Sequence, residues 1–299
     1  MIAFPRCPVD HAVEASKAKP PPIFTQLQQI QQEILVPALH LSPAATPEGL
    51  ESREGLRGSR ITNERFSGAA VSNMRVSYLQ APGIEVFSSA VYPTCDVPVL
   101  GVSAMLMGPS CCMVAVDFQP LLRRAAADAD DPALAPLLAI KRRHPRLQQP
   151  LVRDTYRGSP FFSDGMLYAR FANPVADLES EVLPAFREAV EAYAAVVAAA
   201  PLPSADTAVA VRRRISEFDA FHAEREQAHS VVKASFGEAW ANQYIERFLY
   251  PHACLLAAEG GGVGGASAGS GGAGGAVVTA LKPPEAAAAA AAASTARTE

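Results

Sequence analysis

Two neighbouring apolar segments, Val99–Met107 and Cys112–Phe118, place the strongest constraint on how this chain can fold. Each is short, rich in residues that favour strands and bounded by turn residues. The connection between them is short and begins with Gly108-Pro109-Ser110, so the two strands are expected to pair antiparallel. Apolar side chains occupy both faces of each strand, which is typical of a sheet that is covered on both sides.

Other segments extend this pattern into an α/β fold. Further strands are expected at Asn73–Leu79, Ile84–Tyr92 and Gly165–Phe171, with short connections that indicate an antiparallel meander. Helices are expected at Phe24–His40, Leu121–Ile140, Ala176–Ala200, Ile215–Ser235 and Glu238–Tyr250. The sequence therefore predicts a three-layer α/β/α sandwich with a central antiparallel sheet.

Composition divides the chain into three parts. Residues 260–299 are nearly all Gly, Ala and Ser and end in the run Ala286–Ala293, so they are expected to form a low-complexity tail. Residues 1–22 lack an apolar core segment of a secretory signal and are expected to be a flexible leader or a targeting remnant. Residues 23–259 form the expected folded domain.

Several function classes lose support from composition. The net charge of −4 disfavours nucleic acid as the main partner, and no apolar run is long enough to span a membrane. The 5 cysteines form neither a disulfide framework nor a metal knuckle, which favours a reducing compartment. No Gly-rich phosphate loop or metalloprotease motif is present, so nucleotide-cofactor enzymes lose their usual support.

Four polar residues, Asp219, His222, Glu226 and His229, follow a helical spacing within Ile215–Ser235. This spacing predicts one polar stripe beside an apolar stripe, and such a stripe can line a pocket. A solvated helix flank is the alternative interpretation. Metal ligation by His222, Glu226 and His229 has no second cluster to support it, so no metal site is expected.

Charged residues outside this helix allow two interpretations each. Arg170 lies in a strand of a sheet that is expected to be covered, so it needs an anion: either a structural ion pair or the carboxylate of a ligand. Asp117, at a strand end, is expected to act as a cap. The basic clusters Lys141–Arg146 and Arg212–Arg214 are either solvated surfaces or docking sites for an acidic partner.

Three ordered blocks of sequence resemble the ferredoxin-dependent bilin reductases. Residues 81–122, with "VF", "YP", "LG" and "DFQPLL" in order, resemble the central sheet of that family. Phe161–Phe171 (FFSDGMLYARF) resembles its arginine-bearing strand, and Phe221–Tyr250, with FGEAW, resembles its C-terminal helix pair. The resemblance covers about residues 24–252 and is stronger to the phycoerythrobilin-forming and phytochromobilin-forming branches, with a dihydrobiliverdin:ferredoxin oxidoreductase-like pattern.

This resemblance implies an α/β/α sandwich that holds a linear tetrapyrrole between the sheet and the C-terminal helices. It implies no bound metal or organic redox cofactor, because reduced ferredoxin supplies single electrons to the bilin in this family. Ferredoxin is acidic, so the two basic clusters become candidate docking faces. The resemblance also implies a monomer in the plastid stroma of a chloroplast.

The family pattern also suggests roles for individual residues. Glu226 aligns with the family's C-terminal carboxylic acid and is expected to be the principal proton donor. Ser103 stands where the family carries Asp or Asn, so this catalytic position could only orient a water. Arg170 is expected to bind a propionate, while Ser88, His222 and His229 are expected to line the substrate site.

Two function classes follow from this pattern. The first is a two-electron reductase of biliverdin or dihydrobiliverdin, because the phycocyanobilin branch has His and Glu where this chain has Arg75 and Ser77, and His where it has Ser88. The second is a non-catalytic bilin-binding or chaperoning paralogue, which Ser103 favours. An α/β protein that binds another apolar carboxylate is a third possibility if the resemblance misleads.

Overall fold

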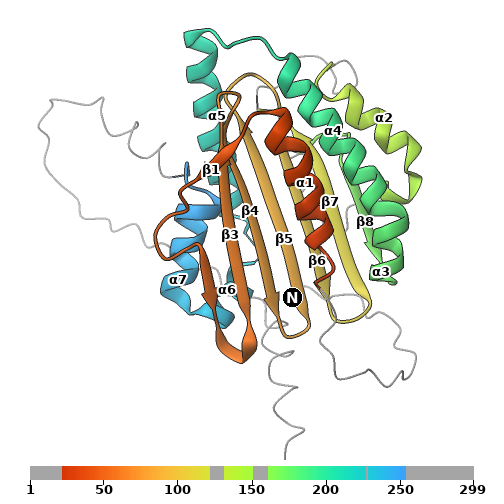
Figure 1. The fold of residues 1–299 in the computed structure, drawn as a ribbon, viewed down its shortest axis with the longest axis vertical. Coiled ribbons are helices and arrows are strands. Elements are labelled where there is room, and N and C mark those ends of the chain that lie inside the picture. Colours follow the sequence, from red (N-terminus) through yellow and green to blue (C-terminus); the bar gives the residue numbers. More distant parts are fainter. Residues whose placement is uncertain (1–21, 122–130, 151–160, 227, 254–299) are drawn as a thin grey trace, which may run out of the picture.

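One large antiparallel sheet organises the described part of the chain (Figure 1). A computed structural model describes residues 22–121, 131–150, 161–226 and 228–253. The 8-stranded sheet has the order β1-β3-β4-β5-β6-β7-β8, with β2 paired to β3. The strands are β1 (Ser42–Ala44), β2 (Ser52–Glu54), β3 (Arg60–Ser67), β4 (Val71–Ala81), β5 (Ile84–Pro93), β6 (Val99–Met107), β7 (Cys111–Gln119) and β8 (Leu167–Phe171).

The predicted α/β class and antiparallel sheet are confirmed, and the strand boundaries agree closely. β6 has the predicted bounds, while β8 begins at Leu167 rather than Gly165. Gly83 and Gly108 adopt φ values of +72° and +66° in the two hairpin turns, a region that glycine enters without steric cost. The backbone N–H of Gly108 donates to the carbonyl of Gly83 at 2.7 Å, which joins the two turns.

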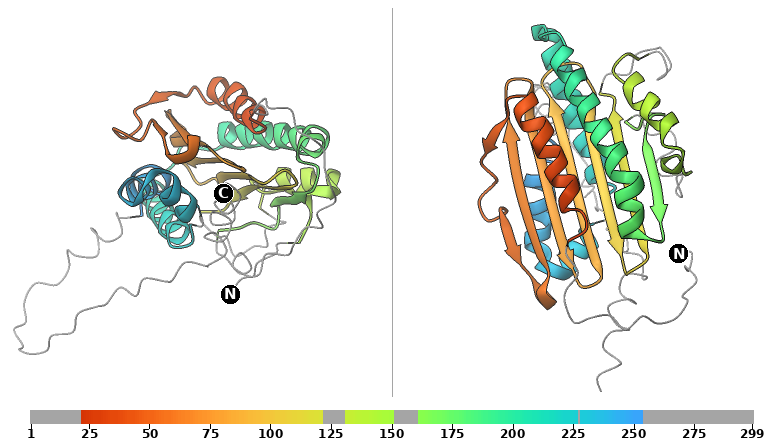
Figure 2. Two further views of the ribbon diagram at one scale, coloured as in Figure 1. Left: turned by 90° about the horizontal axis from the view of Figure 1, so that it is seen from below. Right: turned by 45° about the vertical axis from the view of Figure 1, so that its right-hand side comes forward.

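One face of the sheet packs against α1 (Thr25–Ala38) and α4 (Leu183–Ala199), which run side by side across it in Figure 2. Their side chains also bond to the sheet: the Tyr193 hydroxyl donates to the carbonyls of Val91 at 3.2 Å and Pro98 at 3.0 Å. The shorter elements near α4 are α2 (Ala135–Arg143), α3 (Pro174–Asp177), a π-helical turn η5 (Leu178–Val182) and the 3-10 turn η3 (Pro145–Leu147). A second 3-10 turn, η1 (Leu56–Gly58), precedes β3 and contacts α6.

The C-terminal helices lie against the opposite face, as Figure 2 shows from below. They are α5 (Ala205–Ala223), α6 (His229–Phe236), α7 (Glu238–Gln243) and the π-helical turn η6 (Tyr244–Leu249). The ring of Phe218 in α5 meets the ring of Tyr92 in β5 edge to face, with centroids 6.0 Å apart. Ser204 caps α5 by accepting a hydrogen bond from Thr207 N at 3.1 Å.

The single helix predicted over Ile215–Ser235 is wrong. α5 ends at Ala223 and α6 begins at His229, so a turn separates them. In this turn the Glu226 carboxylate accepts the backbone N–H of Ala228 at 2.6 Å, a local hydrogen bond that competes with a continuous helix. The helix predicted at Leu121–Ile140 is also shorter in the described residues, where α2 starts at Ala135.

Three further predictions concern the limits of the domain, membrane-spanning segments and metal sites. Residues 1–21 and the predicted tail 260–299 lie outside the described residues, so the domain limits stay predictions. Within the described ranges, no helix has the length and apolar character of a membrane span. The same residues contain no group of three or more His, Cys, Asp or Glu side chains suited to a metal ion.

Candidate functional site

The face of the sheet toward the C-terminal helices carries a row of small polar side chains. Strand register places Ser77 opposite Ser88, Ser88 opposite Ser103 and Ser103 opposite Ala115, across β4, β5, β6 and β7. Directly opposed residues of paired strands point to the same face. The predicted site residues Ser88 and Ser103 are therefore neighbours, and their hydroxyls do not ionise near neutral pH.

Solvent reaches the middle of this face. Along β6 and β7 most residues directed toward the other face, such as Val102 and Val114, are buried, whereas those in the middle of the serine-bearing face are partly exposed. The partly exposed residues on this face of β6 and β7 are Gly101, Ser103, Met105, Cys111, Met113 and Ala115. The combination of hydroxyl, thioether and small side chains forms a floor that a flat, mostly apolar ligand could contact.

A buried polar cluster lies beside this floor, where β4 and β5 meet the C-terminal helices. Asp219 in α5 is 0% exposed and accepts hydrogen bonds from the Tyr92 hydroxyl at 2.8 Å and from His252 N at 2.9 Å. Burial raises the pKa of Asp219 to about 7, although these hydrogen bonds and the charge of Arg75 act in the opposite direction. Asp219 can therefore hold or release a proton near neutral pH.

Glu226 joins the cluster through a tyrosine rather than through a helical stripe. One carboxylate oxygen accepts the Tyr250 hydroxyl at 2.6 Å, and the other accepts Ala228 N at 2.6 Å. The Arg75 guanidinium lies over the same tyrosine ring, with its Cζ 5.4 Å from the ring centroid. Tyr250 thus contacts both Glu226 and Arg75, and in this way it connects Glu226 to β4.

His222 and His229, which were predicted to share a stripe, lie in different environments. His222 is surrounded by aromatic rings, the nearest being Phe218 with centroids 4.3 Å apart, and its Nε2 has no hydrogen-bond partner. Burial lowers the pKa of His222 to about 3, so its imidazole is neutral at physiological pH. His229 instead bonds through Nε2 to Asn242 Oδ1 at 2.9 Å, in contact with α7. The single stripe is therefore wrong, and within the described residues His229 forms no hydrogen bond or ion pair with the buried cluster.

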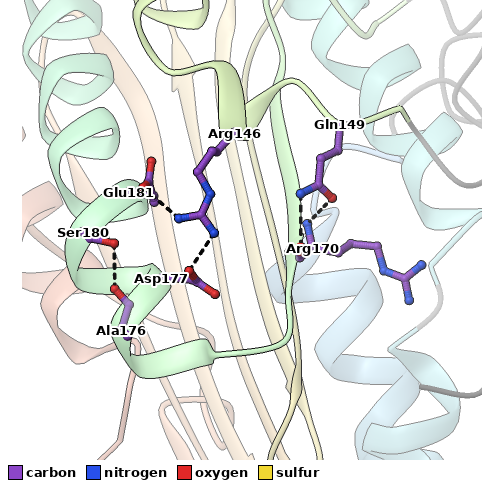
Figure 3. A network of polar contacts seen from close by, with 7 residues as sticks. All are labelled: Arg146, Gln149, Arg170, Ala176, Asp177, Ser180 and Glu181. Atoms are coloured by element: carbon purple, nitrogen blue, oxygen red, sulfur yellow. Dashed lines mark hydrogen bonds and ion pairs between the residues drawn. The ribbon is translucent and has the colours of Figure 1, made fainter. Parts of the chain in front are cut away.

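Arg170 lies on β8, on the same face as Met113. Figure 3 shows Gln149 holding the backbone of Arg170 while the guanidinium extends away from the ion pairs of Arg146. Gln149 accepts from Arg170 N at 2.9 Å and donates to its carbonyl at 3.2 Å. The Arg170 side chain forms no ion pair with the described residues, so the predicted structural salt bridge is absent from that part of the chain. A ligand carboxylate stays a prediction.

The basic clusters are partly neutralised by neighbouring acids. Arg146 pairs with Asp177 and Glu181, each at 2.8 Å (Figure 3), and Arg143 and His144 both pair with Glu188. In the second cluster, Arg213 and Arg214 pair with Glu217. Arg142 and Arg212 are exposed and form no ion pair with described residues. The charge available for an acidic partner is therefore smaller than the sequence alone indicates.

Asp117 and Arg75 are the two buried ionisable groups of β4 and β7 on this face. Asp117 accepts hydrogen bonds from the Ser163 hydroxyl and from Ser163 N, so it holds the segment before β8, and burial raises its pKa to about 7.

The sequence analysis did not predict Arg75 as a site residue. The sequence signal that could have identified Arg75 is its position as a charged residue between Met74 and Val76, in a strand with an otherwise apolar centre.

Comparison with known proteins assigns the chain to a family. The family model described as ferredoxin-dependent bilin reductase matches residues 27–251. The chain belongs to this family. The match contains the whole sheet and all the C-terminal helices, including every residue of the cluster around Arg75 and Glu226 except His252.

Curated relatives and a solved structure agree with that assignment. A 15,16-dihydrobiliverdin:ferredoxin oxidoreductase of Gloeobacter violaceus is 27% identical over 77% of this chain and 96% of its own length. The enzyme of that name from Synechococcus sp. (strain CC9902) is 30% identical over 70% of this chain and 90% of its own length. A crystal structure of phytochromobilin synthase from tomato in complex with biliverdin has a TM-score of 0.67 at 18% identity, covering 78% of this chain and 84% of that one. The members of this family are ferredoxin-dependent bilin oxidoreductases that take electrons from ferredoxin.

Proposed function

We propose that this bilin reductase carries out a two-electron reduction of a linear tetrapyrrole, with dihydrobiliverdin as the preferred substrate and biliverdin as the second candidate. Two reduced ferredoxins give one electron each, the protein delivers two protons, and one carbon–carbon double bond of the bilin becomes a single bond. The observation that carries this proposal is the pairing of a solvent-accessible serine floor with two carboxyl groups at its edge, the buried Asp219 and the partly exposed Glu226, in a chain that matches the family along residues 27–251.

The proposed site lies between the sheet and the C-terminal helices. Glu226 is the principal proton donor, and Asp219 is a second acid that retains a proton near pH 7. Ser88 and Ser103 contact the flat face of the pigment, Arg170 binds a propionate, and His222 lies against a pyrrole ring. Helix contacts on both faces of the sheet support the three-layer α/β/α arrangement that this site requires.

The remaining parts of the proposal concern the partner and the setting. Ferredoxin docks on one of the two basic clusters, through the exposed Arg142 or Arg212. The protein acts as a monomer in the chloroplast stroma, where reduced ferredoxin and bilins occur together. No resident metal or organic redox cofactor takes part in this scheme.

An anaerobic assay tests the reductase activity. Purified protein is mixed with dihydrobiliverdin or biliverdin and a ferredoxin-reducing system, and absorbance spectra are followed while products are separated by chromatography. A new pigment that forms only with reduced ferredoxin supports the proposal and names the substrate. A stable bound spectrum with no new pigment from either bilin contradicts it.

The second candidate function is a bilin-binding paralogue without catalysis. Ser77, Ser88 and Ser103 favour it, because this row supplies no acid to the pigment. The Ser103→Asp variant separates the two candidates, since a carboxyl group there adds a proton donor to a competent site. We expect faster turnover with unchanged bilin affinity. A variant that binds bilin normally and remains without turnover supports the binding function.

A further inference from the structure

Arg75 is a buried cation that has few partners. It lies in the middle of β4 with 4% of its surface exposed. Among the described residues, its Nη1 donates to the Ser88 hydroxyl oxygen at 3.3 Å and its guanidinium also bonds to the neutral Tyr92 hydroxyl, while its Nε has no partner. Arg75 forms no ion pair within the described residues, which is unusual because transferring a charge out of water is costly unless the charge is paired.

The two neighbouring carboxyl groups do not supply a full countercharge. Asp219 is engaged by Tyr92 and His252, and Glu226 is engaged by Tyr250 and Ala228. Neither lies within ion-pair distance of Arg75. Burial favours the protonated form of Asp219 and raises its pKa to about 7, which further reduces the negative charge near the guanidinium. Arg75 therefore carries a positive charge that no carboxylate of the cluster contacts directly.

This positive charge lies beside the proposed pigment site. Its contact Ser88 is partly exposed and pairs in register with Ser103, which faces the same solvent-accessible floor. Arg75 and Ser88 are thus one hydrogen bond apart at the edge of that floor. A guanidinium remains protonated throughout the physiological pH range, so Arg75 can stabilise negative charge but cannot serve as a proton donor.

We propose that Arg75 is the fixed positive charge that stabilises the one-electron-reduced form of the bound bilin. The inference rests on the proposed function. Reduced ferredoxin is oxidised and passes one electron to the bilin, which becomes a radical anion; an acid of the cluster then delivers a proton and neutralises it. A preorganised charge in a water-poor site acts where negative charge develops, without reorganisation during the reaction. Arg75 acts through space and through Ser88, so it is a positioning residue.

The test measures the potential of the bound pigment in three variants. Arg75→Gln and Arg75→Met remove the charge, and Arg75→Lys keeps it. Arg60→Gln is the control, because Arg60 lies on β3 opposite Gln80, on the other face of the sheet, where it pairs with Glu54. Bilin is bound to each protein, and its first one-electron reduction is titrated with a chemical mediator while the radical is followed by electron paramagnetic resonance.

We expect the charge-removing variants to lower the equilibrium constant for the first electron about tenfold, which corresponds to a potential about 59 mV more negative for one electron. Arg75→Lys should retain most of the wild-type potential, and Arg60→Gln should not change it. An unchanged potential in Arg75→Gln and Arg75→Met overturns the inference. Arg75→Met replaces an unpaired buried charge with an apolar side chain of similar length, so this variant is expected to fold.

The mediator titration separates this inference from the proposed function. If wild-type protein binds bilin but gains no electrons from ferredoxin, the proposed activity fails while the potentials still decide the role of Arg75. If ferredoxin turnover occurs and the potentials do not differ, only the role of Arg75 is overturned. Failure of wild-type protein to bind either bilin overturns both.

Discussion

Asp219 and Glu226 belong to one cluster but differ in what surrounds them. Asp219 is fully buried between β5 and the segment after η6, whereas Glu226 lies in the partly exposed turn before α6. The sequence placed both residues on a single helical stripe because Ala223–Ala228 contains no Gly or Pro that would mark a break. Glu226 could be chosen as a candidate acid from the sequence because it is a carboxylic acid. Its environment could not be predicted, because it depends on the hydrogen bond from Tyr250.

Replacing Glu226 tests the assignment of the proton donor. The Glu226→Gln variant keeps the size of the side chain but cannot deliver a proton, so turnover should fall by about 100-fold or more. Bilin affinity should change little, because the amide keeps the shape of the carboxylate: its oxygen can accept from Ala228 N and its NH2 group can donate to the Tyr250 hydroxyl oxygen. The measurement is the rate of product formation under saturating bilin. Glu246→Gln, at an exposed position of η6, is the control, and equal rates in both variants would exclude Glu226 as the donor.

Replacing Asp219 tests the raised pKa through stability. The unfolded carboxyl has a pKa of 3.8 and the folded one about 7, so between these values the folded protein holds a proton that the unfolded chain has lost. The free energy of unfolding therefore falls as pH rises from about 4 to about 7, by up to about 1.4 kcal/mol per pH unit for this group. Above pH 7 this contribution is lost and the dependence levels off.

Denaturant unfolding at several pH values measures that slope in wild-type protein and in Asp219→Asn. The variant should have a flatter dependence between pH 4 and 7, whatever its absolute stability. Asp117→Asn is the matched comparison, because burial raises the pKa of Asp117 to about 7 as well. Parallel pH dependences in wild type and Asp219→Asn would show that Asp219 is ionised in the folded protein across this range.

At the scale of elements, local sequence predicts the strands better than the helix ends. The turns at Gly83 and Gly108 impose positive φ values, and alternation fixes the face of each side chain, so β5 and β6 follow from short stretches of sequence. The break between α5 and α6 is different, because Glu226 in the intervening turn accepts a hydrogen bond from Tyr250, which follows η6, and α6 packs against η1. Neither contact leaves a periodic signal in the helix itself.

Gly55 shows how closely α6 approaches the sheet edge. A Cβ at Gly55 would lie 2.4 Å from the carbonyl oxygen of Ser235 and 2.7 Å from the ring of Phe236. Gly55→Ala should therefore push α6 away and lower the free energy of unfolding by roughly 1–3 kcal/mol. Arg57→Gly in the same loop is the control with the opposite sign, because Arg57 adopts φ +55° and glycine removes that steric cost. Chemical denaturation measures both, and an unaltered Gly55→Ala stability would contradict the close packing.

At the scale of the whole molecule, residues far apart in sequence make the site. Arg75 and Tyr92 come from neighbouring strands, whereas Asp219, Glu226 and Tyr250 come from the C-terminal third of the chain. The fold class and the serine row follow from strand order and alternation, so they can be predicted from sequence. The contacts among these five residues depend on how η6 packs across β4, and no local pattern specifies that packing.

Docking of an acidic electron donor is also a property of the whole molecule, because it depends on charges left unpaired after folding. Arg142 on α2 and Arg212 on α5 are exposed and have no ion-pair partner in the part of the chain that the structure describes, whereas Arg146 pairs with Asp177 and Glu181. We expect charge reversal at the true docking face, Arg142→Glu or Arg212→Glu, to raise KM for reduced ferredoxin about tenfold, since opposing charges accelerate association and like charges slow it. Steady-state rates at varied ferredoxin and fixed bilin measure this effect.

The two variants lie on different helices, so the one with the larger effect identifies the docking cluster. Raised salt should weaken the wild-type dependence on ferredoxin and reduce the difference between wild type and that variant, because ions screen exposed charges. Arg146→Gln should change KM less than either reversal, since its charge is already compensated by two acids. A KM that is the same in both charge-reversal variants and in wild type at low salt would place the docking face elsewhere on the protein.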